Sequence, residues 1–369
     1  MNKNRVLRIA TRKSALALWQ ANTVKNLLEA DGHTVELNLV TTTGDKMQKG
    51  ALASVALDDP ALPDHLKTGK GLFVKEVQEE ILSGKADLAV HSMKDLPVER
   101  TEGLRVAAVL PRAQASDAMI FSPALLSELA ARWGSGALST QDLTRLLEIL
   151  NEIDWQKWPA IGTTSARRQT FLRHSIPNCA SRLSVLRGNV DTRLQRVANN
   201  EFAFIMLARA GLDRLGFYRP DAMVTLPATL STPAPAQGIV AIECRNDDTP
   251  LLAALSSLNS AQASLQAAFE RTLLWLTGGS CHTALAAHLD GSRLSAWAAH
   301  AEQRRELQFT LTPQQLDNWD QQSRVADHSA LFDALMESPL AQELHHALLD
   351  GGFDALMPLR RPSEKLHRK

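Results

Sequence analysis

The sequence predicts an α/β protein with two doubly wound domains and a smaller C-terminal α+β domain. Strand-like and helix-like segments alternate over most of the chain, and the short apolar strands end in polar loops rich in Arg, Lys and Ser. In an open α/β sheet, ligands bind beyond the carboxyl ends of the strands. These loops are therefore the candidate binding loops.

The first third of the chain contains repeated strand–helix–strand units. The elements we expect there are strands at Arg5–Ala10, Val35–Val40, Ala86–Val90 and Leu104–Leu110, and a first helix at Ser14–Ala30. A strand followed by a helix and then by a further strand predicts a βαβ unit with a right-handed crossover.

A second α/β segment begins near Trp158. The expected strands are Pro159–Gly162, Leu183–Leu186 and Phe202–Leu207, and the expected helices between them are Ser165–Arg173 and Asp191–Ala198. The Pro-rich connector Thr229–Pro235 then leads to an apolar strand at Ile239–Cys244. That strand could return to the first domain, which would make the first domain discontinuous.

The last part of the chain differs in kind and predicts an α+β domain. The expected elements are an amphipathic helix at Ser260–Leu276, paired strands at Arg293–His300 and Glu306–Leu311, a helix at Leu331–Leu349 and a disordered basic tail from Arg360. The predicted domain boundaries are residues 1–112 with 237–256 for domain 1, residues 113–236 for domain 2, and residues 257–369 for domain 3.

Composition limits the classes of partner. A chain of 369 residues is too long for one ordinary core, and 44% hydrophobic and 22% charged residues are typical of soluble globular proteins. Because Lys+Arg and Asp+Glu are both 40, bulk charge favours neither a nucleic-acid nor a membrane partner. No apolar run reaches membrane-spanning length and the N-terminus lacks a signal-peptide pattern, so we expect a cytoplasmic protein.

The cysteines and histidines predict no metal site. The three cysteines and 11 histidines show no metal-ligand spacing, and no glycine loop typical of nucleotide cofactors is present. Cys179 and Cys244 lie in or beside apolar sequence and are interpreted as inert. Cys281 lies in the loop T-G-G-S-C-H-T, where a thiol is either a small inert side chain or a nucleophile ionised by nearby cations.

The loop after the strand Ala86–Val90 places an acid directly beside a base. Lys94 and Asp95 lie in the segment V-H-S-M-K-D-L-P-V-E, and Pro97 prevents both a helix and a sheet from continuing. By spacing alone, the segment is either a solvated turn or part of a reactive site.

Cationic side chains recur after strands and at helix starts. They are Arg12, Lys70, Lys94, Arg167, Arg168, Arg187 and Arg193, accompanied by the hydroxyl groups of Ser14, Thr163, Thr164 and Ser165. Each arginine taken singly could be a solvated surface residue. Two α/β lobes would direct the whole set at one cleft, which predicts a binding site for a small molecule with several carboxylates or phosphates.

These residues lie in long motifs that follow one another in order along the chain. The motifs are R-I-A-T-R-K-S-A-L-A-L-W-Q (8–20), G-K-G-L-F-V-K-E (69–76), A-V-H-S-M-K-D-L-P-V-E (89–99), G-T-T-S-A-R-R-Q (162–169), L-R-G-N-V-D-T-R-L (186–194), A-G-L-D-R-L-G (210–216) and Q-G-I-V-A-I-E-C-R (237–245). Together they resemble the porphobilinogen deaminase family, also called hydroxymethylbilane synthases.

The resemblance implies a fold and an activity. The family has three domains, two of them similar to periplasmic-binding-protein lobes with the cleft between them. Its members are transferases of porphyrin and haem biosynthesis that polymerise four porphobilinogen units head to tail with release of ammonia, giving hydroxymethylbilane. A dipyrromethane cofactor, bound by a thioether to Cys281 in this chain, would prime the reaction. Porphobilinogen would be the partner, with no nucleic acid and no membrane, and we expect a monomer.

The resemblance also assigns roles to single residues. Asp95 matches the catalytic aspartate, whose carboxylate would stabilise the cationic attacking pyrrole and manage proton transfer. The residues that would hold the cofactor are Lys94, Asp95, Thr163, Thr164, Ser165, Arg167, Arg168, Arg187, Gly188 and Cys281. The residues that would hold the substrate are Arg12, Ser14, Lys70, Phe73, Arg193, Arg214 and Gln237.

The chain departs from the family pattern at several positions. Gly278-Gly279-Ser280-Cys281 replaces E-G-G-C, Ala236 replaces a glycine, and Ser116 stands where an Arg commonly precedes Asp117. Insertions around residues 51–66 and 122–158 are expected to be loops.

Two other functions stay open. A binding protein would keep the anion cleft without needing Asp95 or a reactive Cys281. A non-catalytic paralogue would bind tetrapyrroles or polycarboxylates without turnover.

Overall fold

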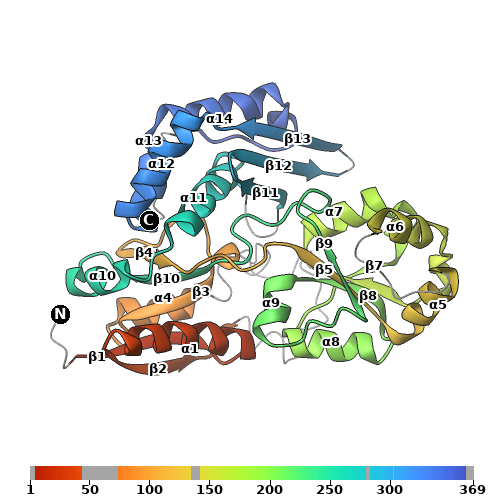
Figure 1. Ribbon diagram of the computed structural model, residues 1–369, viewed down its shortest axis with the longest axis horizontal. Coiled ribbons are helices and arrows are strands. Elements are labelled where there is room, and N and C mark those ends of the chain that lie inside the picture. Colours follow the sequence, from red (N-terminus) through yellow and green to blue (C-terminus); the bar gives the residue numbers. More distant parts are fainter. Residues whose placement is uncertain (1–4, 44–73, 134–141, 280–282, 302, 363–369) are drawn as a thin grey trace. The chain divides into compact units, whose positions relative to one another are not determined.

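The computed structural model describes residues 5–43, 74–133, 142–279, 283–301 and 303–362 (Figure 1). The chain divides into two compact units. Unit 1 consists of Met1–Ala113 and Ala234–Lys369, and unit 2 consists of Gln114–Pro233. The expected insertion at residues 51–66 lies outside the described residues.

Unit 1 contains a five-stranded sheet with the order β2-β1-β3-β10-β4. β1 is parallel to β2 and β3, whereas β10 is antiparallel to both β3 and β4. These strands and their helices are β1 (Val6–Arg12), α1 (Ala15–Ala30), β2 (Thr34–Val40), α4 (Lys75–Leu82), β3 (Leu88–Ser92), β4 (Leu104–Val109), β10 (Val240–Arg245) and α10 (Thr249–Ser256). The strand expected after Pro235 therefore does return to the first sheet.

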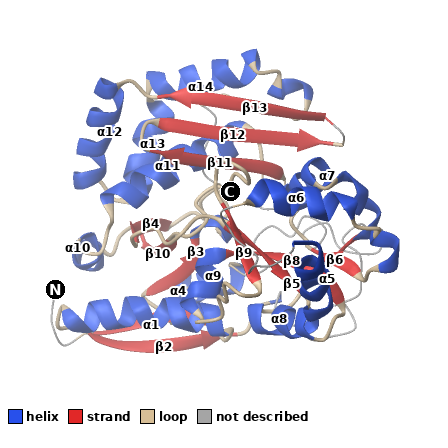
Figure 2. Ribbon diagram, turned by 45° about the vertical axis from the view of Figure 1, so that its right-hand side comes forward, coloured by secondary structure: helices blue, strands red, loops and turns tan. Residues whose placement is uncertain are grey.

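A three-stranded antiparallel sheet with the order β11-β12-β13 forms the other part of unit 1 (Figure 2). Its elements are α11 (Ala261–Leu276), β11 (Ala284–Asp290), β12 (Arg293–His300), β13 (Gln303–Thr310), α12 (Pro313–Val325), α13 (His328–Glu337) and α14 (Pro339–Asp350). α11 packs against β11 and against the C-terminal helices, and the rings of Phe269 and Trp319 meet edge to face at 6.2 Å. This part is the predicted α+β domain.

Unit 2 repeats the strand pattern of the first sheet, with the order β7-β6-β8-β5-β9. β6, β7 and β8 are parallel, and β5 is antiparallel to both of its neighbours. The elements are β5 (Asp117–Phe121), α5 (Pro123–Trp133), α6 (Leu143–Glu152), β6 (Ala160–Gly162), α7 (Ala166–Ser175), β7 (Leu183–Ser184), α8 (Val190–Ala198), β8 (Phe202–Ala208), α9 (Arg209–Arg214) and β9 (Met223–Leu226). The predicted fold class, two doubly wound domains and a smaller α+β domain, is confirmed.

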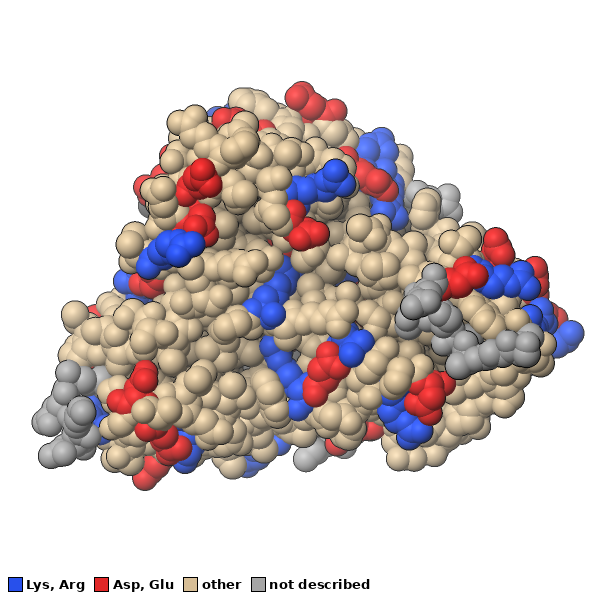
Figure 3. Space-filling model, in the orientation of Figure 1, with Lys and Arg blue, Asp and Glu red and all other residues tan. Residues whose placement is uncertain are grey.

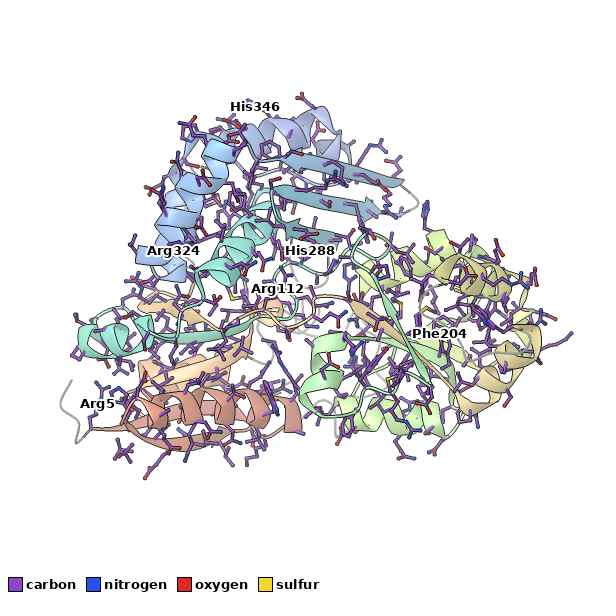
Figure 4. All side chains as sticks on the ribbon, in the orientation of Figure 1. Arg5, Arg112, Phe204, His288, Arg324 and His346 are labelled. Atoms are coloured by element: carbon purple, nitrogen blue, oxygen red, sulfur yellow. The ribbon has the colours of Figure 1, made fainter. Side chains whose placement is uncertain are left out.

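The prediction of a loop over residues 122–158 is wrong, because α5 and α6 lie there. Leu146, Ile149 and Leu150 of α6 are buried at helical spacing, and they share a core with Trp155 and Phe204. The last two rings approach to 5.6 Å, and Figure 4 labels Phe204 within this unit. These helices complete the core of unit 2.

Two helix predictions in the last part are also wrong in detail. α11 is not amphipathic, since every residue from Ala267 to Leu276 is buried. The single helix predicted at Leu331–Leu349 is two helices, α13 and α14, which are separated at Ser338. Pro339 lacks an amide hydrogen and disfavours helical geometry at the residue before it, and Ser338 is accordingly extended, with φ −83° and ψ 159°.

Surface charge matches the balanced composition. On the face shown in Figure 3, the described Lys and Arg side chains lie intermixed with Asp and Glu. No helix among the described residues is long and apolar enough to cross a membrane.

We predict that Gly238→Ala destabilises the protein far more than Gly32→Ala. Both glycines have positive φ, +93° and +85°, so each alanine costs about 1–2 kcal/mol in backbone strain. Only at position 238 would the new Cβ lie 2.5 Å from the carbonyl oxygen of Ala113. We therefore expect Gly238→Ala to lose at least about 2 kcal/mol more than the control in urea unfolding. Equal losses would contradict the close contact.

A second prediction concerns the acid sensitivity of unit 1. His328 of α13 is buried beside Ser264, and burial lowers the pKa of this imidazole from 6.5 to about 3. Between about pH 6.5 and pH 3, the unfolded chain binds a proton at His328 whereas the folded protein keeps this imidazole neutral. The contribution of His328 to the free energy of unfolding is therefore complete above about pH 6.5 and is lost as pH falls towards 3. The slope from this one residue is up to about 1.4 kcal/mol per pH unit.

Denaturant unfolding between pH 7 and pH 4 measures this slope. We expect His328→Gln to flatten it, whereas the control His346→Gln, on an exposed site of α14 (Figure 4), leaves it unchanged. Equal slopes in the wild type and in His328→Gln would show that the residue is not held neutral.

Candidate functional site

The carboxyl-end edge of the first sheet brings together several of the predicted residues. β1 and β3 are parallel neighbours, so Arg12 at the end of β1 and the 3₁₀ turn Met93–Asp95 after β3 lie at one edge. β10 runs the opposite way, and the pairing of its first residue, Val240, with Ser92 places Gln237 near the same edge. Lys94 and Arg12 are half-buried, Gln237 is buried and Asp95 is exposed.

Ser14 has a local role at this edge. It is the N-cap of α1, and its hydroxyl oxygen accepts a hydrogen bond from the backbone N–H of Ala17 at 3.4 Å. The helix is also tied to the end of β3, because Gln20 Nε2 donates to Ser92 Oγ at 2.8 Å. These contacts hold the start of α1 beside the strand that leads to Asp95.

A buried arginine that the sequence analysis did not single out fixes the Asp95 loop. Arg271 of α11 donates from Nη1 to the carbonyl oxygens of Leu96 at 2.9 Å and Met93 at 3.3 Å, and from Nη2 to that of Pro97 at 2.8 Å. Burial lowers the pKa of this guanidinium to about 10, so it remains charged at neutral pH. These three charge-assisted bonds hold the backbone on both sides of Asp95.

The equivalent edge of unit 2 carries the second group of predicted residues. Thr163 follows β6, and Ser165 caps α7 by accepting a hydrogen bond from the Arg168 N–H at 3.4 Å. Arg187 and Gly188 follow the parallel strand β7, and Arg193 Nε donates to the Gly188 carbonyl at 2.7 Å. The remaining predicted residues of unit 2, Thr164 and Arg214, are both half-buried.

Two of these arginines share one buried carboxylate. Asp117 is the first residue of β5 and has no exposed surface; its oxygens lie 2.7 Å from Nη2 of Arg167 and 2.7 Å from Nη2 of Arg168. Burial lowers the pKa of Arg167, and the charge of Asp117 opposes this shift. The sequence analysis expected both arginines to face a ligand, but the structure shows that each first binds a protein carboxylate. Two cations against one anion still leave an excess positive charge.

Unused donors at this edge fit a group that carries carboxylates. Within residues 142–279, the buried Nε of Arg167 and Nη2 of Arg187 have no hydrogen-bond partner. Buried guanidinium N–H groups need acceptors, and a carboxylate-bearing ligand would supply them. Among the described residues, no three His, Cys, Asp or Glu side chains lie close enough to bind a metal ion.

The predicted residues Lys70, Phe73 and Cys281 lie outside the described residues. α11 and the turn Thr277–Gly279 lead directly to Cys281. The other two cysteines, Cys179 and Cys244, are fully buried, and burial raises the pKa of each thiol to about 12. A thiol in that state is a poor nucleophile, which agrees with their interpretation as inert.

Sequence reasoning missed the buried partners of the site, Arg271, Glu270 and Asp117. A signal was present for the first two, because adjacent charged residues interrupt the apolar stretch Ala267–Leu276. Charged side chains that are buried in this way are nearly always paired. Asp117 gave no local signal, since its arginine partners lie some fifty positions further along the chain.

Two doubly wound sheets with cationic loops at their strand ends define the structural class of this chain. A family model described as "Porphobilinogen deaminase, dipyromethane cofactor binding domain" matches residues 7–253. The porphobilinogen deaminase of Trichlorobacter lovleyi is 40% identical over 285 residues, 76% of this chain and 78% of that protein. That of Geobacter metallireducens is 35% identical over 350 residues, 93% and 94% of the two chains. The chain belongs to the porphobilinogen deaminase family, whose members are transferases.

Likeness to solved structures is weak. The ligand-binding component of an ABC-type import system from Staphylococcus aureus aligns over 98% of this chain and 97% of its own, with 11% identity and a TM-score of 0.39.

We predict that Asp117→Asn strongly destabilises unit 2, because it leaves two buried guanidinium groups without a counter-charge. Breaking a buried ion pair from one side costs about 3–5 kcal/mol. Asp221→Asn is the matched control, since its pair with Arg219 is exposed and water and salt screen such a pair. Urea unfolding compares the two variants, and similar losses would contradict the assigned role of Asp117.

Proposed function

We propose that this transferase joins four porphobilinogen units head to tail, with release of ammonia, and yields hydroxymethylbilane. The observation that carries the proposal is the geometry of Asp95. It is an exposed carboxylate on a turn whose backbone is held by the buried Arg271, at a sheet edge that also carries Arg12 and Lys94. A fixed anion among cations suits a reaction in which positive charge develops on an anionic substrate.

The residues present fit a dipyrromethane cofactor bound through Cys281. We assign the carboxylates of this group to Lys94, Arg167, Arg168 and Arg187, assisted by the hydroxyls of Thr163, Thr164 and Ser165 and by the backbone of Gly188. When bound, the cofactor supplies the pyrrole carbon to which the first substrate unit is joined. The assignment is supported by the buried Nε of Arg167 and Nη2 of Arg187, which have no hydrogen-bond partner in the part of the chain that the structure describes.

Asp95 is the proposed catalytic residue. Its carboxylate would accept hydrogen bonds from pyrrole N–H groups and stabilise the positive charge that develops during bond formation. Because Arg271 holds the backbone on both sides, the carboxylate needs little rearrangement when that charge appears. The remaining predicted residues would hold the substrate: the cationic or polar Arg12, Ser14, Lys70, Arg193, Arg214 and Gln237, and the apolar Phe73.

The proposal includes a monomer that acts in the cytoplasm without a nucleic-acid or membrane partner. Equal numbers of acidic and basic residues support the absence of a nucleic-acid partner, because they leave no bulk charge to attract a polyanion. Sedimentation of the purified enzyme with and without DNA tests the oligomeric state and the absence of binding.

Intact-mass measurement and turnover assays test the reaction. We expect the purified wild type to carry an adduct with the mass of a dipyrromethane, Cys281→Ala to lack it, and the control Cys179→Ala to keep it, because Cys179 is fully buried. Asp95→Ala should keep the adduct and lose at least about 100-fold in kcat, the lower range for a general acid–base group.

Other results would point to another function. An unmodified wild-type mass after expression with porphobilinogen available, together with binding of tetrapyrroles, would indicate the non-catalytic paralogue. Normal turnover in Asp95→Ala would remove that residue from its role.

A further inference from the structure

The C-terminal segment returns to the helix that leads to Cys281. The backbone N–H of Arg360 donates to the carbonyl oxygen of Leu276 at 2.7 Å, and its guanidinium lies 4.5 Å from the ring centre of Trp275. Both partners belong to the last turn of α11. The segment is close-packed, since a Cβ on Gly278 would lie 3.4 Å from the Pro358 carbonyl oxygen. The prediction that the tail is disordered from Arg360 onward is therefore wrong for Arg360 itself.

The same guanidinium also binds the Asp95 loop. Nη1 and Nη2 of Arg360 both lie 3.1 Å from Oε1 of Glu99, which follows Asp95 by four residues. The Arg360 and Glu99 side chains are only 27% and 12% exposed, so water and salt screen this pair less than an ordinary surface pair. One side chain thus joins the last turn of α11 to the far end of the loop that carries Asp95.

We propose that Arg360 is a positioning residue for the transfer reaction, because it sets the end of α11 against the Asp95 loop. Arg271 holds the near side of that loop, through Met93 to Pro97, and Arg360 holds its far side through Glu99. All of these residues belong to unit 1. The proposal rests on the proposed function, in which Asp95 and Cys281 act in one reaction. A small misplacement of reacting groups costs rate without abolishing binding.

Substitutions in the full-length holoenzyme test this role. Arg360→Met keeps the length of the side chain and removes its charge. We expect kcat to fall about five- to tenfold and KM to change less than about twofold, because the carboxylate is misplaced while the substrate-binding cations remain. Arg360→Lys, which restores a charge opposite Glu99, should recover at least half of the lost activity.

Hydrogen exchange supplies a second readout that does not depend on turnover. In Arg360→Met, the amides of residues 93–99 and 274–279 should exchange about tenfold faster, whereas those of α1 should not change. Arg324→Met is the matched control. Arg324 is an exposed arginine of α12 paired with Asp320 (Figure 4), and the variant should match the wild type in kcat and in exchange.

A double-mutant cycle with Glu99→Gln shows whether Arg360 acts through Glu99. Glu99→Gln alone should lower kcat about as much as Arg360→Met, and the double variant should be no worse than either single variant. Additive losses, or wild-type kcat and exchange in Arg360→Met, overturn the inference. If Arg360→Met fails to fold, Glu99→Gln decides, and wild-type kcat in that variant overturns it.

The experiments distinguish a failure of the proposed function from a failure of the positioning role of Arg360. A wild type without the dipyrromethane adduct overturns the function and the positioning role with it. A loaded, active wild type whose Arg360→Met variant behaves identically overturns only the role of Arg360.

Discussion

A buried ion pair between Glu270 and Arg112 is the contact on which the arrangement of unit 1 depends. Glu270 has no exposed surface, and its oxygens accept hydrogen bonds from Arg112 at 2.6 and 3.1 Å. They also accept from the backbone N–H groups of Ala236 at 2.6 Å and Leu289 at 2.9 Å, and one oxygen lies 3.2 Å from His288 Nδ1. Figure 4 labels Arg112 and His288. Burial raises the pKa of this carboxyl, but Arg112 and His288 lower it more, so the net shift is downward. Arg112 and Ala236 lie on the two segments through which the chain leaves and re-enters unit 1. One carboxylate therefore fixes both segments and the end of β11.

The next residue of the same helix holds the Asp95 loop. Successive residues of an α-helix point about 100° apart, so Glu270 and Arg271 reach different surroundings. A buried charge is costly unless it is paired. The charged Glu270 and Arg271 can therefore be buried only when their partners are in place, namely the segments of Arg112 and Ala236 for Glu270 and the Asp95 loop for Arg271. Ala236 shows how firmly this is set, since it keeps a φ of +59° that normally favours glycine. The geometry of the proposed catalytic loop is thus coupled to the packing of the core.

Local patterns were sufficient to predict most of the strands. Segments such as Leu88–Ser92 and Phe202–Ala208 are apolar runs of strand length bounded by turn residues, and such runs mark the buried centre of an α/β sheet. Leu146, Ile149 and Leu150 have the spacing of a helix, so the periodicity of this segment indicates α6 even though comparison with the family pattern predicts only an inserted loop. The break between α13 and α14 was equally visible in the sequence, at Pro339.

The residues of the site were predictable as types and positions, but their partners were not. In a doubly wound sheet, a residue directly after a parallel strand lies at the edge where ligands bind, independently of the long-range contacts of the chain. Arg12, Lys94 and Arg187 could therefore be placed at this edge from the sequence. Whether such a cation faces a ligand or a protein carboxylate depends on pairing between segments far apart in the sequence. β5 runs antiparallel to β8, and Asp117 pairs with Ala208 at the end of β8. This pairing places the Asp117 carboxylate at the same edge as the arginines. Because that single carboxylate meets two arginines, the edge keeps a positive charge even though the chain as a whole is neutral. The positive charge is therefore a local property of the strand ends, which net charge could not reveal.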